Sequence, residues 1–175
     1  MSIVIRKGEK KDLDSFVDLQ QQVHEGMEHP EWFYVDSADE VHALMENGVM
    51  ELWLAMDGSR VAGALDLLIP GLESYNYGYV LNFSEEELLR TVNMDSAAVH
   101  PDYRGQGIQR ALLETAEQWL GRDRDRILLC TVHPDNIYSL RNAVGQGYTI
   151  VRKIGIYGSV RYLLQKNIEK SEKNS

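Results

Sequence analysis

The chain has 175 residues, 43% of them hydrophobic and 26% charged, which are ordinary values for one globular domain with a single sizeable core. Its formal net charge of −9 at pH 7 argues against nucleic acid or an anionic membrane as a partner, because either would require a clustered basic face. The longest apolar stretches are shorter than a membrane span, the first residues lack the features of a secretory signal, and the single cysteine, Cys130, has no partner for an internal disulfide. We therefore expect a cytoplasmic protein.

In chain order, the sequence predicts a mixture of strands and helices from end to end. Apolar residues that recur every second position indicate strands, and apolar residues spaced three and four apart indicate helices. The pattern predicts strand 3–6, helix 10–27, a helix between Ser37 and Gly48, strands 49–56 and 60–69, a short helix 85–90, strand 91–99, helix 108–120, strand 126–132, a helix from Asp135 or Asn136 to Gly145, and strands 148–154 and 160–166. Residues 1–166 are thus expected to form a single domain, and residues 167–175 a charged tail.

Aromatic side chains gather in two segments between the predicted elements. Residues 31–34 follow a proline and include Trp32 and Tyr34, and the irregular stretch 71–90 includes Tyr75 and Tyr77. Irregular stretches of that length in compact domains are usually functional or disordered, and aromatic content favours order. Each segment forms either a buried connection or a pocket wall that binds a substrate.

A glycine-bearing loop joins strand 91–99 to helix 108–120. His100-Pro101 ends the strand because proline donates no ladder hydrogen bond, and Arg104-Gly105-Gln106-Gly107 follows. The glycines let the backbone bend sharply and let a ligand approach bare amides. Because the first N–H groups of a helix have no internal partner and its dipole favours negative charge there, the loop is typical of a phosphate site. The alternative is an ordinary turn with two glycines.

The spacing of this loop separates the known phosphate loops. The pattern G-x-x-x-x-G-K-[ST] is missing from the sequence, and Arg110 stands where the dinucleotide fingerprint G-x-G-x-x-G needs its third glycine. A nucleotide-dependent oxidoreductase is therefore disfavoured. The remaining pattern, R-x-x-G after V-H-P-D-Y, closely resembles the acyl-CoA pyrophosphate loop Q/R-x-x-G-x-G/A of the GNAT superfamily of N-acetyltransferases. Arg104 and Gly107 match that loop, whereas Gln109 replaces its usual small residue.

The order of the predicted elements also resembles the GNAT fold over nearly the whole chain. The resemblance implies an α/β (α+β) domain with a central, mixed, twisted sheet of about seven strands flanked by helices. It implies acetyl-CoA as cosubstrate, with Ala98, Val99 and His100 on the pantetheine arm. The pyrophosphate would contact Arg104, Gly105, Gln106, Gly107, Ile108 and Gln109. Asn136 and Ser139, at the start of the last helix, would lie near the thioester.

The reaction implied is attack of a neutral amine on a thioester, which requires a proton acceptor. Asp95 alternates onto one side of its strand with Ala97 and Val99, so it is the candidate base; a strand-end carboxylate satisfied by backbone amides is the alternative. Asn93 lies on the same side and is expected to orient a water. His133 and a water chain remain other routes for the proton. The sequence has no cluster of His, Cys, Asp and Glu with metal-ligand spacing, so no metal is expected. It has no serine in a G-x-S-x-G elbow, so no covalent intermediate is expected.

The proton donor is where the sequence departs most from the resemblance. Many GNAT enzymes carry a tyrosine seven residues after the asparagine at the helix start, and that position here is Ala143. No single tyrosine is therefore expected to be essential. The predicted function is acetyl-CoA-dependent N-acetylation of a small primary amine, either cationic or neutral, bound near Trp32, Tyr34, Tyr75 and Tyr77. The protein is expected to be a monomer or a homodimer. The alternative is a non-catalytic acyl-CoA-binding or sensor module.

Overall fold

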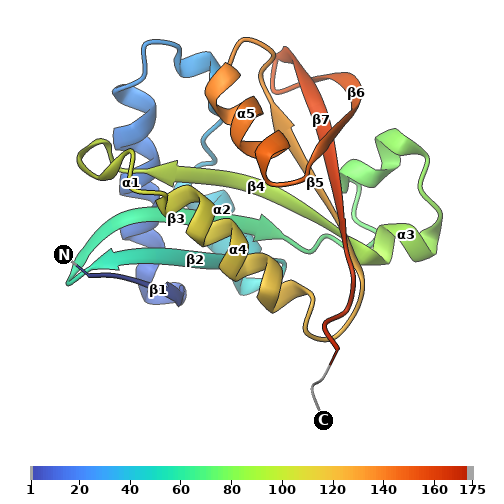
Figure 1. Cartoon of the computed structure of the whole chain (residues 1–175), viewed down its shortest axis with the longest axis horizontal. Coiled ribbons are helices and arrows are strands. Elements are labelled where there is room, and N and C mark those ends of the chain that lie inside the picture. Colours follow the sequence, from blue (N-terminus) through green and yellow to red (C-terminus); the bar gives the residue numbers. More distant parts are fainter. Residues whose placement is uncertain (1, 173–175) are drawn as a thin grey trace. The chain divides into compact units, whose positions relative to one another are not determined.

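The computed structural model describes residues 2–172, and their strands form one mixed sheet (Figure 1). In this part of the chain the sheet has seven strands in the order β1-β2-β3-β4-β5-β7-β6. The pairs β1–β2, β2–β3, β5–β7 and β6–β7 are antiparallel, and β4–β5 is parallel. The strands are β1 (Ile3–Lys7), β2 (Met50–Asp57), β3 (Arg60–Leu68), β4 (Thr91–Val99), β5 (Arg126–Val132), β6 (Thr149–Ile156) and β7 (Ser159–Ile168). This arrangement confirms the predicted α/β class with about seven strands.

Helices connect these strands. The α-helices are α1 (Leu13–Glu25), α2 (Ala38–Glu46), α3 (Glu85–Arg90), α4 (Ile108–Leu120) and α5 (Ile137–Gly145), and the 3₁₀ helices are η1 (Lys10–Asp12), η2 (Pro30–Trp32), η3 (Tyr77–Leu81) and η4 (Pro101–Tyr103). Helices α2 and α3 each begin with a capping box, in which the Ser37 and Ser84 side chains accept hydrogen bonds from the backbone amides of Glu40 and Glu87. Gly48 follows α2 at a positive φ of 73°, as a helix-ending glycine does.

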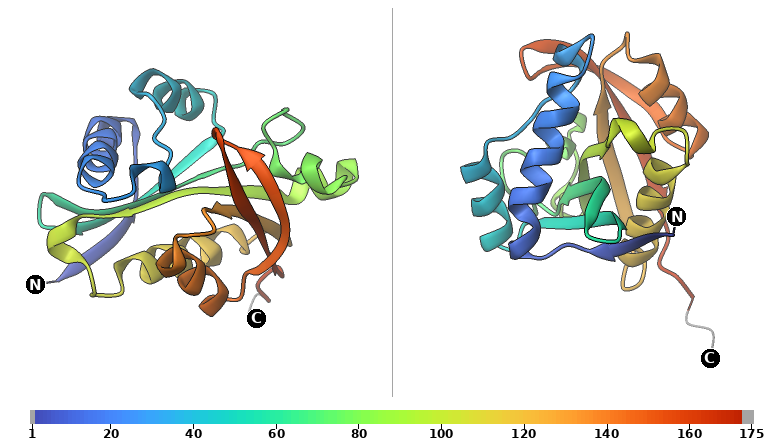
Figure 2. Two further views of the ribbon diagram at one scale, coloured as in Figure 1. Left: turned by 90° about the horizontal axis from the view of Figure 1, so that it is seen from above. Right: turned by 90° about the vertical axis from the view of Figure 1, so that its left-hand side faces the viewer.

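The first of two compact units contains the residues up to 68 together with 95–116. Helices α1 and α2 cover one face of β1–β3, and the beginning of α4 lies on the opposite face (Figure 2). The core beneath α1 and α2 includes Phe16 and Leu13 together with Leu52 and Leu54 of β2, none of them exposed. These side chains recur at helical spacing in α1 and at alternate positions in β2, so sequence periodicity sets this core.

The second unit contains residues 69–94 and those from 117 onward. Its core gathers Tyr77 with Ile127, Leu129 and Leu163 of β5 and β7. Strand β5 has one parallel and one antiparallel neighbour. It pairs in parallel with β4 at three positions, Thr91↔Ile127 to Asn93↔Leu129, but is antiparallel to β7 along its whole length.

Most element boundaries lie within two residues of the predictions, but the predicted helix 10–27 is divided into η1 and a shorter α1 that Gly26 caps. The bounds of β4, α4 and β5 agree with the predicted 91–99, 108–120 and 126–132. Strand β7 continues to Ile168, two residues into the segment predicted to be a tail, because Ile168 pairs with Arg126. The last three residues of that segment lie outside the described part, and a single domain over residues 1–166 stays a prediction.

Candidate active site

The loop between β4 and α4 has the backbone geometry expected of an anion site. Gly105 and Gly107 have φ values of 78° and 74°, in the left-handed region that glycine adopts without strain. A Cβ built on either glycine would meet no other atom within 4 Å, so their backbones face open space. The first helical bond of α4 runs from the Ala111 amide to the Gly107 carbonyl at 3.0 Å. The amides before Ala111 therefore lie in a helix turn without i−4 carbonyls, where phosphate binds well.

Side-chain contacts anchor this loop to the β2–β3 hairpin. The Tyr103 hydroxyl donates to Asp57 Oδ2 at 2.6 Å, and the Arg60 guanidinium lies 5.2 Å from the centre of the Tyr103 ring. Arg60 also donates to Asp102 Oδ2 at 2.7 Å. The loop is thus fixed at its first turn and exposed from Arg104 to Gly107.

Close packing of α4 on β3 depends on Gly63. A Cβ there would lie 2.8 Å from Ile108 Cγ2 and 3.2 Å from the Ala98 carbonyl oxygen, so only glycine allows this approach. Ile108 is consequently buried, whereas Gln109 is half-buried. Ile108 was predicted to contact the pyrophosphate. Because its side chain belongs to the core, such a contact would involve its backbone.

The end of β4 leads directly into the loop. Ala98 is buried, and Val99 and His100 are half-buried. The His100 amide donates to the Ala62 carbonyl at 2.9 Å, which continues the alignment of β4 with β3 for one residue beyond the strand. The three residues predicted for the pantetheine arm therefore form one extended segment leading to the loop.

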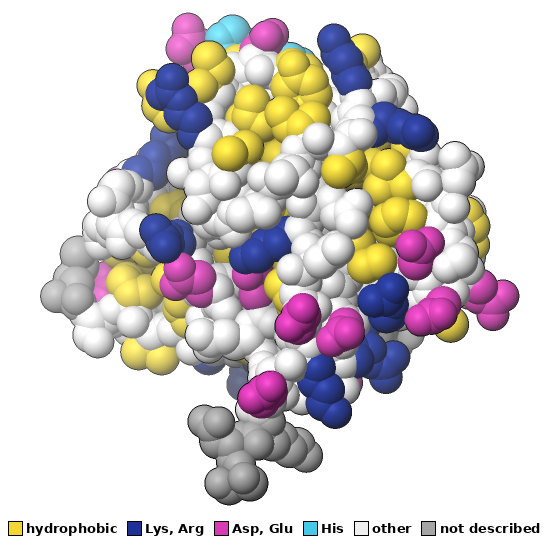
Figure 3. Space-filling view, turned by 45° about the vertical axis from the view of Figure 1, so that its right-hand side comes forward, with side chains coloured by type: hydrophobic (Ala, Val, Ile, Leu, Met, Phe, Trp, Pro, Cys, Tyr) yellow, Lys and Arg dark blue, Asp and Glu magenta, His cyan; other side chains and the backbone are white. Residues whose placement is uncertain are grey.

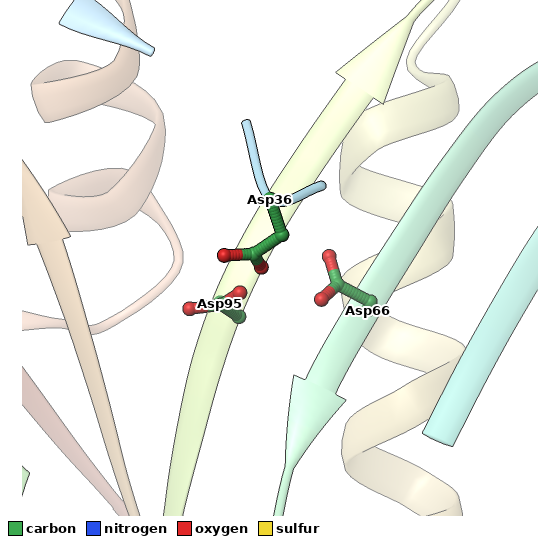
Figure 4. A group of neighbouring side chains, drawn as sticks. All are labelled: Asp36, Asp66 and Asp95. Carbon is green, nitrogen blue, oxygen red and sulfur yellow. The ribbon is translucent and has the colours of Figure 1, made fainter. Parts of the chain in front are cut away.

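Three aspartates lie together in the first unit, and their carboxyl groups turn toward one another (Figure 4). Asp95 comes from β4, Asp66 from β3 and Asp36 from the segment before α2. One carboxylate oxygen of each lies within 4.8 Å of the other two. Asp66 is 2% exposed, and Asp36 and Asp95 are half-buried. We call these three residues the carboxylate cluster.

Burial and mutual repulsion favour the protonated forms in this cluster. Burial raises the pKa of Asp95 well above its usual range, and the neighbouring charges of Asp66 and Asp36 and hydrogen bonds to both raise it further. Burial also raises the pKa of Asp66 to about 7, against the opposing effect of a hydrogen bond from Ser96. The pKa of Asp36 is raised chiefly by burial. Because like charges this close do not all ionise, the carboxyl groups share protons.

The cluster has the donor type that hard cations prefer, since all its ligand atoms are carboxylate oxygens. The sequence predicted no metal because the three residues come from separate segments, and spacing along the chain cannot show such a group. Hydrogen bonds from Asp95 to Asp66 and Asp36 give each carboxyl group a partner through a proton. We therefore interpret the group as proton-sharing. Its chemistry is to accept a proton, or to hold an organic cation.

We expect Asp66→Asn to stabilise the protein at alkaline pH. The folded-state pKa of Asp66 is raised to about 7, so the unfolded chain ionises first as the pH rises, and stability is lost between the unfolded pKa and about 7. Each unit of raised pKa costs roughly 1.4 kcal/mol, and asparagine avoids that cost while still accepting from Ser96. The melting temperature of the variant should exceed that of the wild type at about pH 8 and approach it near pH 5.

Asp14→Asn is the matched control for this measurement, because the Asp14 side chain is 90% exposed and the substitution removes the same formal charge. Equal effects of the two substitutions across the pH range would contradict the raised pKa of the buried Asp66 carboxyl group.

Of the residues predicted to contact the acceptor, Tyr34 lies beside the cluster. It is 46% exposed, and its pKa is raised by burial and by the charges of Glu40, Asp36 and Asp95. Trp32 is half-buried, and the ring of His29 stacks on it with centres 4.3 Å apart. One face of the Trp32 ring is therefore occupied by histidine, whereas Tyr34 keeps an exposed ring next to carboxylates.

In the second unit, Asn93 fastens the aromatic segment to β4. Its Oδ1 accepts from the Tyr77 amide at 3.2 Å, and its Nδ2 donates to the Tyr75 carbonyl at 2.9 Å. Asn93 is 1% exposed. The oxygen and the nitrogen of its side-chain amide thus both bind backbone groups, which explains why a polar residue is buried here. The water that Asn93 was predicted to orient is not needed for this explanation.

Tyr75 and Tyr77 have different surroundings. Tyr75 is 40% exposed, and Tyr77 is 6% exposed within the core of this unit. The Tyr77 hydroxyl lies 2.5 Å from that of Tyr157, a residue with a φ of 54° in the β6–β7 turn. Arg161, also buried, donates through Nε to Thr131 Oγ1 at 3.1 Å and lies 6.0 Å from the centre of the Tyr157 ring. Tyr77 is thus a core residue with a hydrogen-bonded hydroxyl, and its predicted contact with the acceptor is not supported by its burial.

The residues predicted near the thioester begin α5. Asn136 Oδ1 accepts from the Ser139 amide at 3.2 Å, so Asn136 caps the helix, and both residues are half-buried. His133, the alternative base, accepts at Nδ1 from the Asp135 amide at 3.1 Å. That ring nitrogen is therefore engaged by the backbone, and the role of His133 as a base stays a prediction.

Asp36, Asp66, Ser96 and Gln20 were not predicted to lie near the site. Asp66 carried a signal, because it interrupts an apolar strand at a position where burial is expected. Asp36 carried none, since it lies between short elements.

Residues 13–148 match the model of the acetyltransferase (GNAT) family, and no curated protein sequence is significantly similar to the chain. Three similar solved structures each share 16% identity with the chain: yncA from Salmonella typhimurium with its cofactor acetyl-CoA (TM-score 0.66, covering 100% of this chain and 98% of that one), paia N-acetyltransferase from Thermoplasma acidophilum in complex with coenzyme A (0.69, 96% and 100%), and the ribosomal-protein-S18-alanine N-acetyltransferase of Escherichia coli (0.71, 99% and 99%).

Since the family model covers most of the chain, the chain belongs to the GNAT family of acetyltransferases. It is therefore a transferase, as the loop and the order of the elements predicted. The solved structures, at this identity, show the same fold over nearly their whole lengths.

Proposed function

We propose that this protein transfers the acetyl group of acetyl-CoA to a primary amine of a small acceptor by direct attack. The observation that carries the proposal is the carboxylate cluster on β3 and β4, in the same unit as the glycine loop. Similar folds in yncA and paia N-acetyltransferase have been solved with acetyl-CoA and coenzyme A. The open backbone at Gly105 and Gly107 fits a pyrophosphate, so acetyl-CoA is the proposed cosubstrate.

Asp95 is the proposed base. The acceptor nitrogen must lose a proton before or during its attack on the thioester carbonyl, and a base works best when its pKa is near the operating pH. Burial and two neighbouring carboxylates raise the pKa of Asp95, which moves it toward that range. In the balanced reaction the ammonium form of the acceptor first gives one proton to the cluster. The neutral amine then forms the C–N bond as the C–S bond breaks, and the second proton of the nitrogen passes to the leaving thiolate of coenzyme A, directly or through water.

A cationic acceptor suits the cluster. Burial strengthens the repulsion among the three ionised carboxylates. A nearby ammonium group offsets this repulsion and so favours the ionised forms. Tyr34 presents an exposed ring beside these charges, where cation–π contact adds to the attraction. We therefore propose a small amine with a positive charge as the acceptor class. On the face shown in Figure 3, Lys and Arg side chains lie among Asp and Glu side chains, which offers no extended basic area to a polyanion.

Direct attack is proposed because Cys130 is a poor nucleophile. Burial raises the pKa of its thiol to about 12, so the thiolate is scarce near neutrality.

The test of the function is a panel of amines incubated with acetyl-CoA, with release of free thiol as the readout and mass spectrometry of the product. Acetylated amine formed in step with free thiol would support the proposal. Tight binding of acetyl-CoA without turnover of any amine would favour the acyl-CoA-binding or sensor module instead. Among residues 2–172 no helix has the length and apolarity to cross a bilayer. The cytoplasmic location and the monomeric or dimeric state stay predictions.

No single tyrosine is expected to be the essential acid. Position 143 is alanine, Tyr138 is 80% exposed, and the hydroxyls of Tyr77 and Tyr157 contact each other. Each Tyr→Phe variant at 75, 77, 138 and 157 should keep kcat within roughly tenfold, below the usual effect of losing a general acid. Steady-state kinetics at saturating acetyl-CoA measures this, and a loss of several hundredfold in one variant would identify the acid.

A further inference from the structure

A hydrogen-bonded chain runs from helix α1 to the carboxylate cluster. Gln20 Nε2 donates to Ser96 Oγ at 2.6 Å, and Ser96 Oγ in turn donates to Asp66 Oδ1. Gln20 and Asp66 are each 2% exposed. The three residues come from α1, β4 and β3, so the contact exists only in the folded first unit.

The direction of the hydrogen bonds from Gln20 through Ser96 to Asp66 follows from the number of protons that each group can donate. A serine hydroxyl has one proton to donate and lone pairs to accept with. Because the Gln20 amide donates to the Ser96 oxygen, the single hydroxyl proton of Ser96 points to Asp66. Asp66 thus accepts a charge-assisted hydrogen bond that Asp36 and Asp95 do not receive from this serine.

We propose that Ser96, held by Gln20, is a positioning residue that favours negative charge on Asp66, so that Asp95 is the last carboxyl group of the cluster to lose its proton and becomes the base once that proton is lost. This inference deepens the proposed function, because its meaning for catalysis rests on Asp95 being the base. It is consistent with the direction of the other hydrogen bonds, since those that Asp66 receives from Ser96 and Asp95 favour its ionised form, whereas those of Asp95 favour its protonated form.

Charged and polar groups from α1, from α2 and from the segment before α2 face the cluster. Asp36 lies before α2 and repels both other carboxylates. Glu40 of α2 repels Asp36, and Tyr34 is close enough for the charges of Asp36 and Asp95 to affect it. From α1 the contact is the neutral amide of Gln20. The hydrogen bond from the Ser96 hydroxyl is therefore what makes the surroundings of Asp66 different from those of Asp36 and Asp95.

The experiment is an NMR titration of the aspartate carboxyl carbons in the full-length protein, with resonances assigned through Asp66→Asn and Asp95→Asn. In Ser96→Ala the apparent midpoint of the cluster should rise by about one pH unit, because a hydrogen bond to the ionised form is lost. Ser96→Thr keeps the hydroxyl and should restore the wild-type midpoint. An unchanged midpoint in folded Ser96→Ala, or failure of threonine to restore it, would overturn the inference.

A second variant guards against failure of Ser96→Ala to fold. Gln20→Met removes the amide donor at the far end of the chain, so it should raise the midpoint in the same direction by a smaller amount. If Ser96→Ala gives no folded protein, an unchanged NMR midpoint in folded Gln20→Met would overturn the inference.

Kinetics then separates this inference from the proposed function. If Asp95 is the base, the acidic limb of the pH profile of kcat/KM moves upward in Ser96→Ala by the same amount as the NMR midpoint. A moved midpoint with an unmoved limb would support the positioning role and reject Asp95 as the base. The NMR result decides the inference even if no tested amine is acetylated.

Discussion

Asp95→Asn is expected to lower kcat by about 10²–10⁴-fold, the usual effect of losing a general base. Asparagine has nearly the same shape as aspartate but accepts no proton, so substrate positioning should change little. The acidic limb of the pH profile should disappear as well, because this limb reports ionisation of the base. Steady-state kinetics with the acceptor found in the amine panel measures both effects.

The controls for this variant concern binding and folding. The KM for acetyl-CoA should stay close to that of the wild type, because the glycine loop is unchanged. The melting temperature above neutral pH should stay the same or rise, since the substitution removes a buried charge with a raised pKa. A kcat close to the wild-type value in a folded variant would transfer proton acceptance to a water chain or to another group.

Gly107→Asp is expected to have the second large effect, a strong rise in the KM for acetyl-CoA. The Gly107 backbone faces open space at the start of α4, where the amides favour an anion, and a carboxylate there would occupy and repel the phosphate position. Isothermal titration calorimetry with coenzyme A measures the loss directly, without an acceptor.

Backbone strain must be separated from this repulsion, because Gly107 has a φ of 74° and a non-glycine residue costs roughly 1–2 kcal/mol in that region. Gly48→Asp is the matched control: Gly48 has a φ of 73°, and a Cβ built there also meets no atom within 4 Å. Both variants should lose similar stability, but only Gly107→Asp should lose affinity for coenzyme A. Equal affinities in the two folded variants would count against the loop assignment.

The sequence alone was sufficient for the elements and for the loop. Periodicity located β4, α4 and β5 without error, because each has a continuous pattern bounded by proline, glycine or charged residues. The two glycines marked the loop since positive φ is a local requirement that few other residues meet. Alternation along β4 was enough to select Asp95 as the candidate base. Such features depend on neighbours along the chain, which a sequence displays.

The carboxylate cluster was decided by tertiary structure. Asp36, Asp66 and Asp95 meet because the segment before α2 comes beside β3 and β4, and no spacing along the chain encodes this meeting. The pKa of Asp95 then depends on charges and burial contributed by those other segments.

The same reason explains which side-chain surroundings the sequence could not show, although the roles predicted for these residues stay predictions. Tyr77 was expected at the acceptor but is buried in the core, and Asn93 was expected to orient water but binds the backbone of residues 75 and 77. Periodicity tells which side of a strand a residue occupies, but the partner on that side comes from a distant segment. The sequence by itself therefore determined the family, the elements and the loop. The tertiary structure decided which carboxylates act together, because proton sharing requires contact in space.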